Sequence, residues 1–166
     1  MNQPELISKI VAFLEETGIR VEEKELPADT FLPGLDLGPG CLYLHSEKLK
    51  YPGDLLHEAG HLAVTTPEQR FAIGTEKLEL PFPTDGEEIA AVLWSYAAAQ
   101  YLELPPEIVF HENGYKNESS WLIENFGEGN YIGLPFLEWA GLTAGEKRAE
   151  ELGVKPFPHM LKWLRN

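Results

Sequence analysis

The sequence predicts an α+β fold, in which a small β-sheet packs against two buried helices and the C-terminal part is helical. Three observations support this prediction. Residues 89–104 are rich in alanine and apolar on nearly every side, which is typical of a buried helix. Residues 52–64 contain a second apolar stretch bounded by helix start and stop signals. Residues 41–44 form a short apolar run after a turn-rich segment, which indicates a strand.

The first quarter of the chain contains helix and strand signals in alternation. Apolar side chains in residues 4–16 recur at helical spacing, and Gly18 is well placed to end that helix. Residues 19–26 begin with alternating apolar and charged side chains, which favours a short strand. Residues 32–40 are rich in glycine and proline and predict turns that lead into the strand at residues 41–44.

The two buried helices are separated by a segment in which apolar residues recur at neither helical nor strand spacing. Pro52 suits the first turn of the earlier helix, and the sequence Thr-Thr-Pro at residues 65–67 stops it. Residues 67–83 predict a long loop or a pair of irregular strands. Residues 84–88 start the later helix, and Leu-Pro-Pro at residues 104–106 closes it.

The last third of the chain mixes glycine, asparagine and aromatic residues with short helical stretches. Thr143 and Glu146 have the spacing of a capping box, and Gly153 suits the end of the helix that would follow. Residues 158–164 predict a terminal helix.

The length of 166 residues is sufficient for one domain with its own core. The proline pair at the end of the second buried helix suggests a division of the chain. We predict a core of residues 1–105 and a C-terminal extension of residues 106–166 packed on it. A single domain is the alternative.

Composition narrows the range of partners. The chain has 13 basic and 27 acidic residues, so its formal net charge is −14. This charge repels nucleic-acid phosphates and anionic membranes, and neither is expected as a direct partner. No apolar run approaches the ~18–20 residues that span a bilayer. Cys41 is the only cysteine, which excludes an intrachain disulfide and a cysteine-based zinc site. These features predict a protein of the reducing cytoplasm.

The pentapeptide His-Glu-Ala-Gly-His at residues 57–61 is the strongest functional signal. Residues four apart lie on one face of a helix, so His57 and His61 can bind one Zn²⁺ from adjacent turns. Glu58 flanks the same face and can activate a water as a general base. Gly60 costs roughly 1 kcal/mol relative to alanine inside a helix, which predicts a close backbone approach there. The alternative is two helix histidines beside a solvated glutamate.

A third ligand is expected from the following helix, because catalytic zinc sites have three protein ligands. Glu87 and Glu88 both lie in its first turn. Thr84 with Glu87, and Asp85 with Glu88, both have capping-box spacing. If Thr84 is the N-cap, Glu87 closes the box and Glu88 faces inward. We therefore favour Glu88, with Glu87 as the open alternative.

Residues 41–105 resemble the ImmA/IrrE family of zinc metallopeptidase-like proteins, whose members carry an HExxH helix. The matching order is a strand at residues 41–45, the HExxH helix at residues 57–61, and Glu-Ile-Ala-Ala at residues 88–91 on a helix that ends in Leu-x-Leu-Pro. One departure is Val92, which stands where the family commonly has asparagine.

The resemblance implies that His57, His61 and Glu88 bind zinc and that Glu58 activates the attacking water. It also implies a peptide bond as the target. The sequence therefore predicts a zinc-dependent metallohydrolase, a cytosolic metallopeptidase of narrow specificity that acts on a peptide or protein substrate. The alternative is a non-catalytic metal-binding protein that retains the HExxH helix for a regulatory or protein-interaction role.

Three residues of the last third are further candidates for the site. His111, Tyr115 and Tyr131 each carry a group that could stabilise the oxyanion of a tetrahedral intermediate. For each of them, a structural role as a loop histidine or a core aromatic residue is the alternative.

Overall fold

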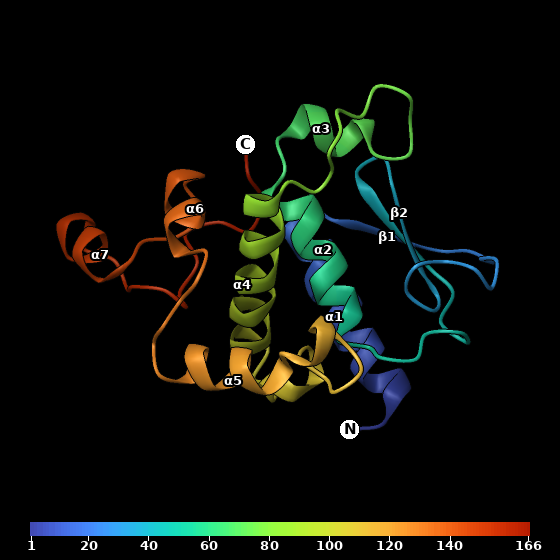
Figure 1. Cartoon of the computed structure of the whole chain (residues 1–166), viewed down its shortest axis with the longest axis horizontal. Helices are drawn as coiled ribbons and strands as arrows, with labels where there is room; N and C mark the ends of the chain where they lie inside the picture. The colour runs from blue at the N-terminus through green and yellow to red at the C-terminus, as the bar shows by residue number, and fades with distance from the viewer.

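Two helices, α2 (Asp54–Val64) and α4 (Asp85–Tyr101), lie side by side at the centre of the computed structural model, which describes residues 1–166 (Figure 1). Helix α1 (Gln3–Thr17) also contacts α2, and a three-stranded sheet lies beside α1 and α2. This arrangement confirms the predicted α+β class.

The close contact between α2 and α4 depends on the absence of a side chain at Gly60. A Cβ atom at this position would lie 2.7 Å from the carbonyl oxygen of Ala91. Real Cβ atoms essentially never make contacts this short, so any larger residue would force the two helices apart. The close approach predicted from the sequence is thereby confirmed.

The sheet contains β1 (Arg20–Glu23), β2 (Leu35–Gly38) and β3 (Cys41–Leu44) in the order β1-β3-β2. Strand β1 pairs with β3 in parallel, and β2 pairs with β3 as an antiparallel hairpin. The segment at residues 32–40 has the predicted turns at residues 33–34 and 39–40, but it also contains strand β2, which was not predicted. Pro39 and Gly40 form the turn, but the residues before them alternate in polarity and pair with β3.

The segment between the two buried helices also differs from its prediction. Residues 67–72 form helix α3 (Pro67–Ala72) rather than a loop or strands, whereas residues 73–83 form the predicted loop. Thr66 accepts a hydrogen bond from the Gln69 amide, and Pro67 occupies the first helical turn, so the residues that end α2 also begin α3. Buried Arg70 donates to the Leu62 and Thr65 carbonyl oxygens and ties α3 to the end of α2.

The C-terminal part is helical, as predicted, with short elements. It contains two 3₁₀ turns, η1 (Pro106–Ile108) and η2 (Tyr115–Asn117), and three helices, α5 (Ser119–Gly127), α6 (Leu134–Trp139) and α7 (Glu146–Leu152). Figure 1 shows α5 crossing one end of α4, with α6 beside the other part of α4 and α7 farther out.

Two predictions for this part are wrong. Thr143 does not cap α7, because its hydroxyl donates to the His159 carbonyl oxygen (2.7 Å) and Gly145 is the N-cap residue. Residues 158–164 form turns rather than a helix, because they pair with residues 142–143 and insert Trp163 against Phe13. In both places contacts with distant residues replace the local helical pattern. The predicted end of α7 is confirmed, since Gly153 is left-handed with φ 68°.

Most of the buried apolar residues form one cluster that includes members from both sides of Pro105. Trp94 on α4 and Phe110 and Phe126 from the C-terminal part are all buried within it. The division into residues 1–105 and 106–166 stays a prediction. None of the helices combines the length and apolar character of a membrane span.

Candidate metal centre

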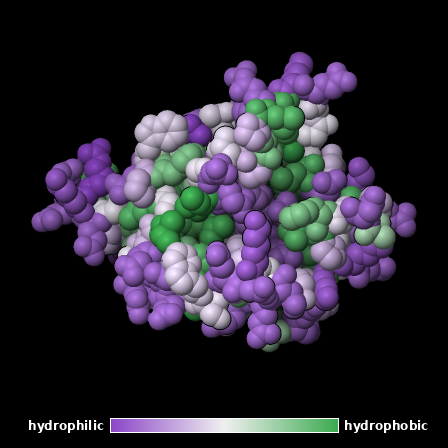
Figure 2. Space-filling model, viewed as in Figure 1, coloured by the Kyte–Doolittle hydropathy of each residue, from purple (hydrophilic) through white to green (hydrophobic).

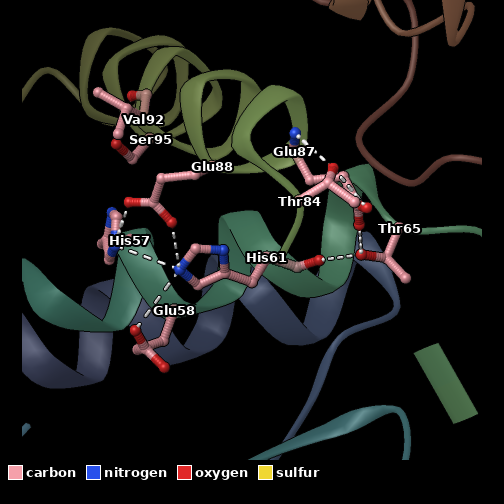
Figure 3. Close-up of polar contacts among 9 residues, drawn as sticks. All are labelled: His57, Glu58, His61, Thr65, Thr84, Glu87, Glu88, Val92 and Ser95. Carbon is pink, nitrogen blue, oxygen red and sulfur yellow. Dashed lines mark hydrogen bonds and ion pairs between the residues drawn. The ribbon is translucent and has the colours of Figure 1, made fainter. Parts of the chain in front are cut away.

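Three side chains converge between α2 and α4: His57 and His61 from α2, and Glu88 from the first turn of α4 (Figure 3). The two Nε2 atoms lie 3.2 Å apart. One Glu88 oxygen lies 3.5 Å from Nε2 of His57, and the other lies 3.3 Å from Nε2 of His61. The three residues form a group that could hold a metal ion.

These separations fit a tetrahedral ion. Zinc bonds to nitrogen and oxygen are about 2.0–2.2 Å long, so two ligand atoms of a tetrahedral site lie roughly 3.3–3.5 Å apart. The three distances of the group fall close to this range, with a different Glu88 oxygen facing each histidine. The donor set of two imidazoles and one carboxylate also suits zinc, although other divalent ions accept it. The residues present therefore fit the metal that the sequence predicts.

The cap of α4 explains why Glu88 rather than Glu87 joins the histidines. The Thr84 hydroxyl accepts from the Glu87 amide and donates to the Glu87 carboxylate (2.8 Å). The same carboxylate lies 3.0 Å from the Thr65 hydroxyl at the end of α2. Glu87 is thus engaged at the helix start, and the next residue points toward His57 and His61, as Figure 3 shows.

Glu58 lies beside the group without being part of it. Its carboxylate is 3.8 Å from Nε2 of His61, and its side chain is largely buried. Figure 3 shows Glu58 and Glu88 approaching the His61 ring from different sides. An acidic group in this position can exchange a proton with a molecule held at the three candidate ligands.

Burial sets the protonation of the site. It lowers the pKa of His57 to about 3 and the pKa of His61 to about 4, so both rings are neutral at pH 7. Neutral imidazole is the form that binds metal ions. Burial, together with the nearby carboxylates of Asp54 and Glu88, raises the pKa of Glu58 to about 8. Glu58 is therefore mostly protonated at pH 7 in the metal-free protein, and a cation bound beside it would lower its pKa and favour the proton-accepting carboxylate.

A cleft of about 530 Å³ opens onto the centre. His57 and Glu88 line it, and so does His111 from the C-terminal part. Nε2 of His111 lies 2.7 Å from Asp54, and the His111 ring stacks on Tyr51 with centroids 3.9 Å apart. The sequence prediction named His111 as a candidate, and the structure brings it to the cleft that borders the centre.

Asp54 is a residue of the cleft that the sequence analysis missed. It is 5% exposed, and burial raises the pKa of its carboxyl, partly opposed by the hydrogen bond to His111. Its position one helical turn before His57 places it on the same face of α2. That spacing was the only available signal, and a carboxylate at a helix start is ordinarily a stabilising residue.

The two tyrosine candidates have different surroundings. The Tyr115 ring packs edge-on against His57, with centroids 5.3 Å apart, and its buried hydroxyl has no hydrogen-bond partner. Burial and the Asp54 and Glu88 carboxylates raise the pKa of this hydroxyl well above its ordinary value, partly opposed by the nearby Ser95 hydroxyl. Tyr131 instead packs against Tyr96 and Phe157 and is not among the residues that line the cleft.

The outer shell of the centre is incomplete. The Nδ1 atoms of His57 and His61 are buried without a protein partner, whereas metal-binding histidines ordinarily donate their second N–H to a carboxylate or carbonyl. Val92, one turn after Glu88, adds no polar group. Comparisons with protein-family models, curated protein sequences and solved structures find no match to this chain. The function is therefore inferred from the residues of the site.

Proposed function

We propose that this protein is a zinc-dependent hydrolase, a cytoplasmic metallopeptidase of narrow specificity. The observation that carries the proposal is that His57 and Glu88, which converge with His61, line a cleft, and that Glu58 lies beside His61. Catalytic zinc sites keep a position open to a cleft, whereas structural sites are closed by a fourth protein ligand. The lone cysteine, buried Cys41, supports a reducing compartment.

Each residue of the site has a chemical role in this proposal. Bound Zn²⁺ would supply a Lewis acid that lowers the pKa of water and polarises a carbonyl group. Glu58 accepts the proton of the attacking water and returns it to the leaving amine. The Tyr115 hydroxyl, which has no partner in the protein, is free to donate to the oxyanion that develops. The peptide bond as target rests on the resemblance to the ImmA/IrrE family.

The test combines metal analysis with a change at Glu58. Protein purified without chelators is analysed for zinc by mass spectrometry, and cleavage of a peptide library is followed for the wild type and for Glu58→Gln. We expect about one zinc per chain in both proteins and a loss of turnover of at least about 100-fold in the variant. Negligible zinc would exclude the metal site, and full activity of Glu58→Gln would exclude the proton-transfer role.

A non-catalytic metal-binding protein that acts through a partner is the second candidate function. The unpartnered Nδ1 atoms of His57 and His61 favour it, because loss of outer-shell partners typically weakens metal affinity or activity 10–100-fold. In this case Glu58 would close the site as a fourth ligand. Glu58→Gln would then lower zinc affinity, whereas the catalytic proposal predicts that zinc affinity is kept.

A further inference from the structure

A second hollow borders the metal centre and has a different character from the cleft. It is a groove of about 350 Å³ between α4 and α5. Glu88, Tyr115 and Lys116 line both the groove and the cleft, so the two hollows share a wall at a candidate metal ligand. The other lining residues are mainly apolar, and we call this hollow the apolar groove: Ile89, Val92, Trp121, Leu122, Phe126 and Ile132.

The apolar groove is open to solvent. Ile89 is 43%, Trp121 48% and Ile132 42% exposed, although all three are large apolar residues. Figure 2 shows apolar surface, in green, over α4 next to hydrophilic residues. A contiguous apolar hollow with a few polar groups at one end is the usual form of a ligand pocket.

The walls of the groove are held by the core. Phe126 is 1% exposed and packs against Tyr96 and Phe110, with ring centroids 5.1 and 5.7 Å apart. Tyr115 contacts Phe110 on one side and His57 on the other. Because these contacts fix the groove relative to the metal centre, a side chain seated in it holds its own backbone at a fixed place.

We propose that the apolar groove is a specificity pocket that receives a bulky apolar side chain of the peptide substrate, next to the bond presented to His57, His61 and Glu88. This inference rests on the proposed function and names its substrate class. Val92 on α4 and the exposed rim residues Trp121 and Ile132 are the residues that select the side chain.

Charge favours a peptide over a fatty acyl chain as the occupant. An acyl chain that placed its carboxylate at the metal would bring negative charge to a protein of net charge −14. At the groove itself, the Glu88 and Glu118 carboxylates outnumber the single Lys116 ammonium group. A peptide with basic residues around one apolar side chain is complementary to this field.

The experiment measures binding rather than turnover. Two peptides, acetyl-Lys-Ala-Phe-Ala-Lys-amide and the same peptide with asparagine in place of phenylalanine, are titrated into the full-length Glu58→Gln protein with and without Zn²⁺. We expect the phenylalanine peptide to bind about tenfold more tightly, because its ring leaves water. Methyl resonances of Ile89, Val92 and Ile132 should shift with this peptide alone.

A matched pair of variants locates the effect. Val92→Asn places a polar group in the groove and should reduce the preference for phenylalanine at least about fivefold. Val11→Asn is the control, because Val11 is also a half-buried helical valine that lines a separate hollow against β1. Ile132→Asn, at the exposed rim, repeats the test if Val92→Asn does not fold.

The outcomes separate this inference from the proposed function. Equal affinity for the two peptides, or a preference unaffected by both groove variants, would overturn the inference even in a protein that cleaves peptides. Displacement of the phenylalanine peptide by micromolar decanoate would also overturn it, in favour of an acyl-chain pocket. A third outcome is that the zinc-loaded wild type prefers the phenylalanine peptide but cleaves no peptide. This result would support the specificity pocket and contradict the proposed hydrolase function.

Discussion

Helices α2 and α4 carry the candidate ligands at regular helical spacings. The chain after Leu104, by contrast, surrounds the same centre with residues from irregular turns. His57 and His61 share a face of α2 because they are four residues apart. His111 and Tyr115 reach the centre only through long-range contacts with Asp54 and His57. The comparison indicates that the candidate metal ligands come from the helix pair, whereas part of the wall of the adjoining cleft comes from the C-terminal part.

The largest expected effect is a loss of zinc affinity, which should follow substitution of Glu88 but not of the neighbouring Glu87. Glu88→Gln removes a charged candidate ligand and should weaken zinc binding by more than about 100-fold, beyond the usual cost of an outer-shell partner. Glu87→Gln should keep zinc affinity and reduce the free energy of unfolding by about 1 kcal/mol, because it alters only the cap and the contact with Thr65. Competition with a zinc-binding dye measures both. Equal losses of affinity would contradict the assignment of Glu88.

The next effect is the pH dependence of the free energy of unfolding of the metal-free protein, because Glu58 on α2 is a largely buried carboxyl group. The pKa of Glu58 is raised from 4.5 to about 8, so its contribution to stability is fully present below pH 4.5 and is lost as pH rises to about 8. The histidine pKa values are lowered, so their contribution is present above pH 6.5 and is lost as pH falls toward about 3 to 4.

These opposite signs predict maximal stability of the metal-free protein near pH 6.5 from these three groups. Between pH 6.5 and 8 the wild type should lose about 1 kcal/mol, because the loss from Glu58 is partly offset by the histidines, whereas Glu58→Gln should lose nothing. Urea unfolding at several pH values in the presence of a chelator measures the difference. The exposed Glu124→Gln is the control and should follow the wild type. A parallel loss in Glu58→Gln would show that another group causes it.

A smaller effect is expected for the C-terminal wall. Tyr115→Phe removes a hydroxyl that has no partner in the protein, so stability should stay the same or rise by up to about 1 kcal/mol. Turnover should fall about tenfold with zinc affinity unchanged, because the donor acts on the substrate. Thermal unfolding, zinc titration and kcat are compared with those of Tyr131→Phe, which should keep its activity. A loss of stability in Tyr115→Phe would indicate a structural hydroxyl instead.

The smallest effect concerns the distance between the two helices. Gly60→Ala should destabilise the protein by about 1 kcal/mol, because the clash with the Ala91 carbonyl exceeds the gain in helix propensity. Gly127→Ala, at a helix position where nothing lies within 4 Å of the added Cβ, should be neutral or slightly stabilising. Chemical unfolding of both variants tests this contrast, and a stabilising Gly60→Ala would mean that the helices can separate without cost.

The sequence by itself determined the fold class, both buried helices and the set of candidate ligands. These features are local, because the separation of His57 from His61 follows from helix geometry and the choice of Glu88 follows from the Thr84 cap. Gly60 is a further example, since its cost inside a helix predicted the close approach to Ala91.

Only the tertiary structure decided the surroundings of the centre. It brought Asp54 and His111 together, although they are 57 positions apart in the sequence. It also paired Thr143 with the His159 carbonyl rather than with the start of α7. The apolar groove likewise formed only where α4 and α5 pack together. Such contacts join residues with no fixed spacing, so their geometry depends on how whole elements pack. The spacing of side chains along one helix is set by its backbone, whereas the shape of a pocket is set by every element that lines it.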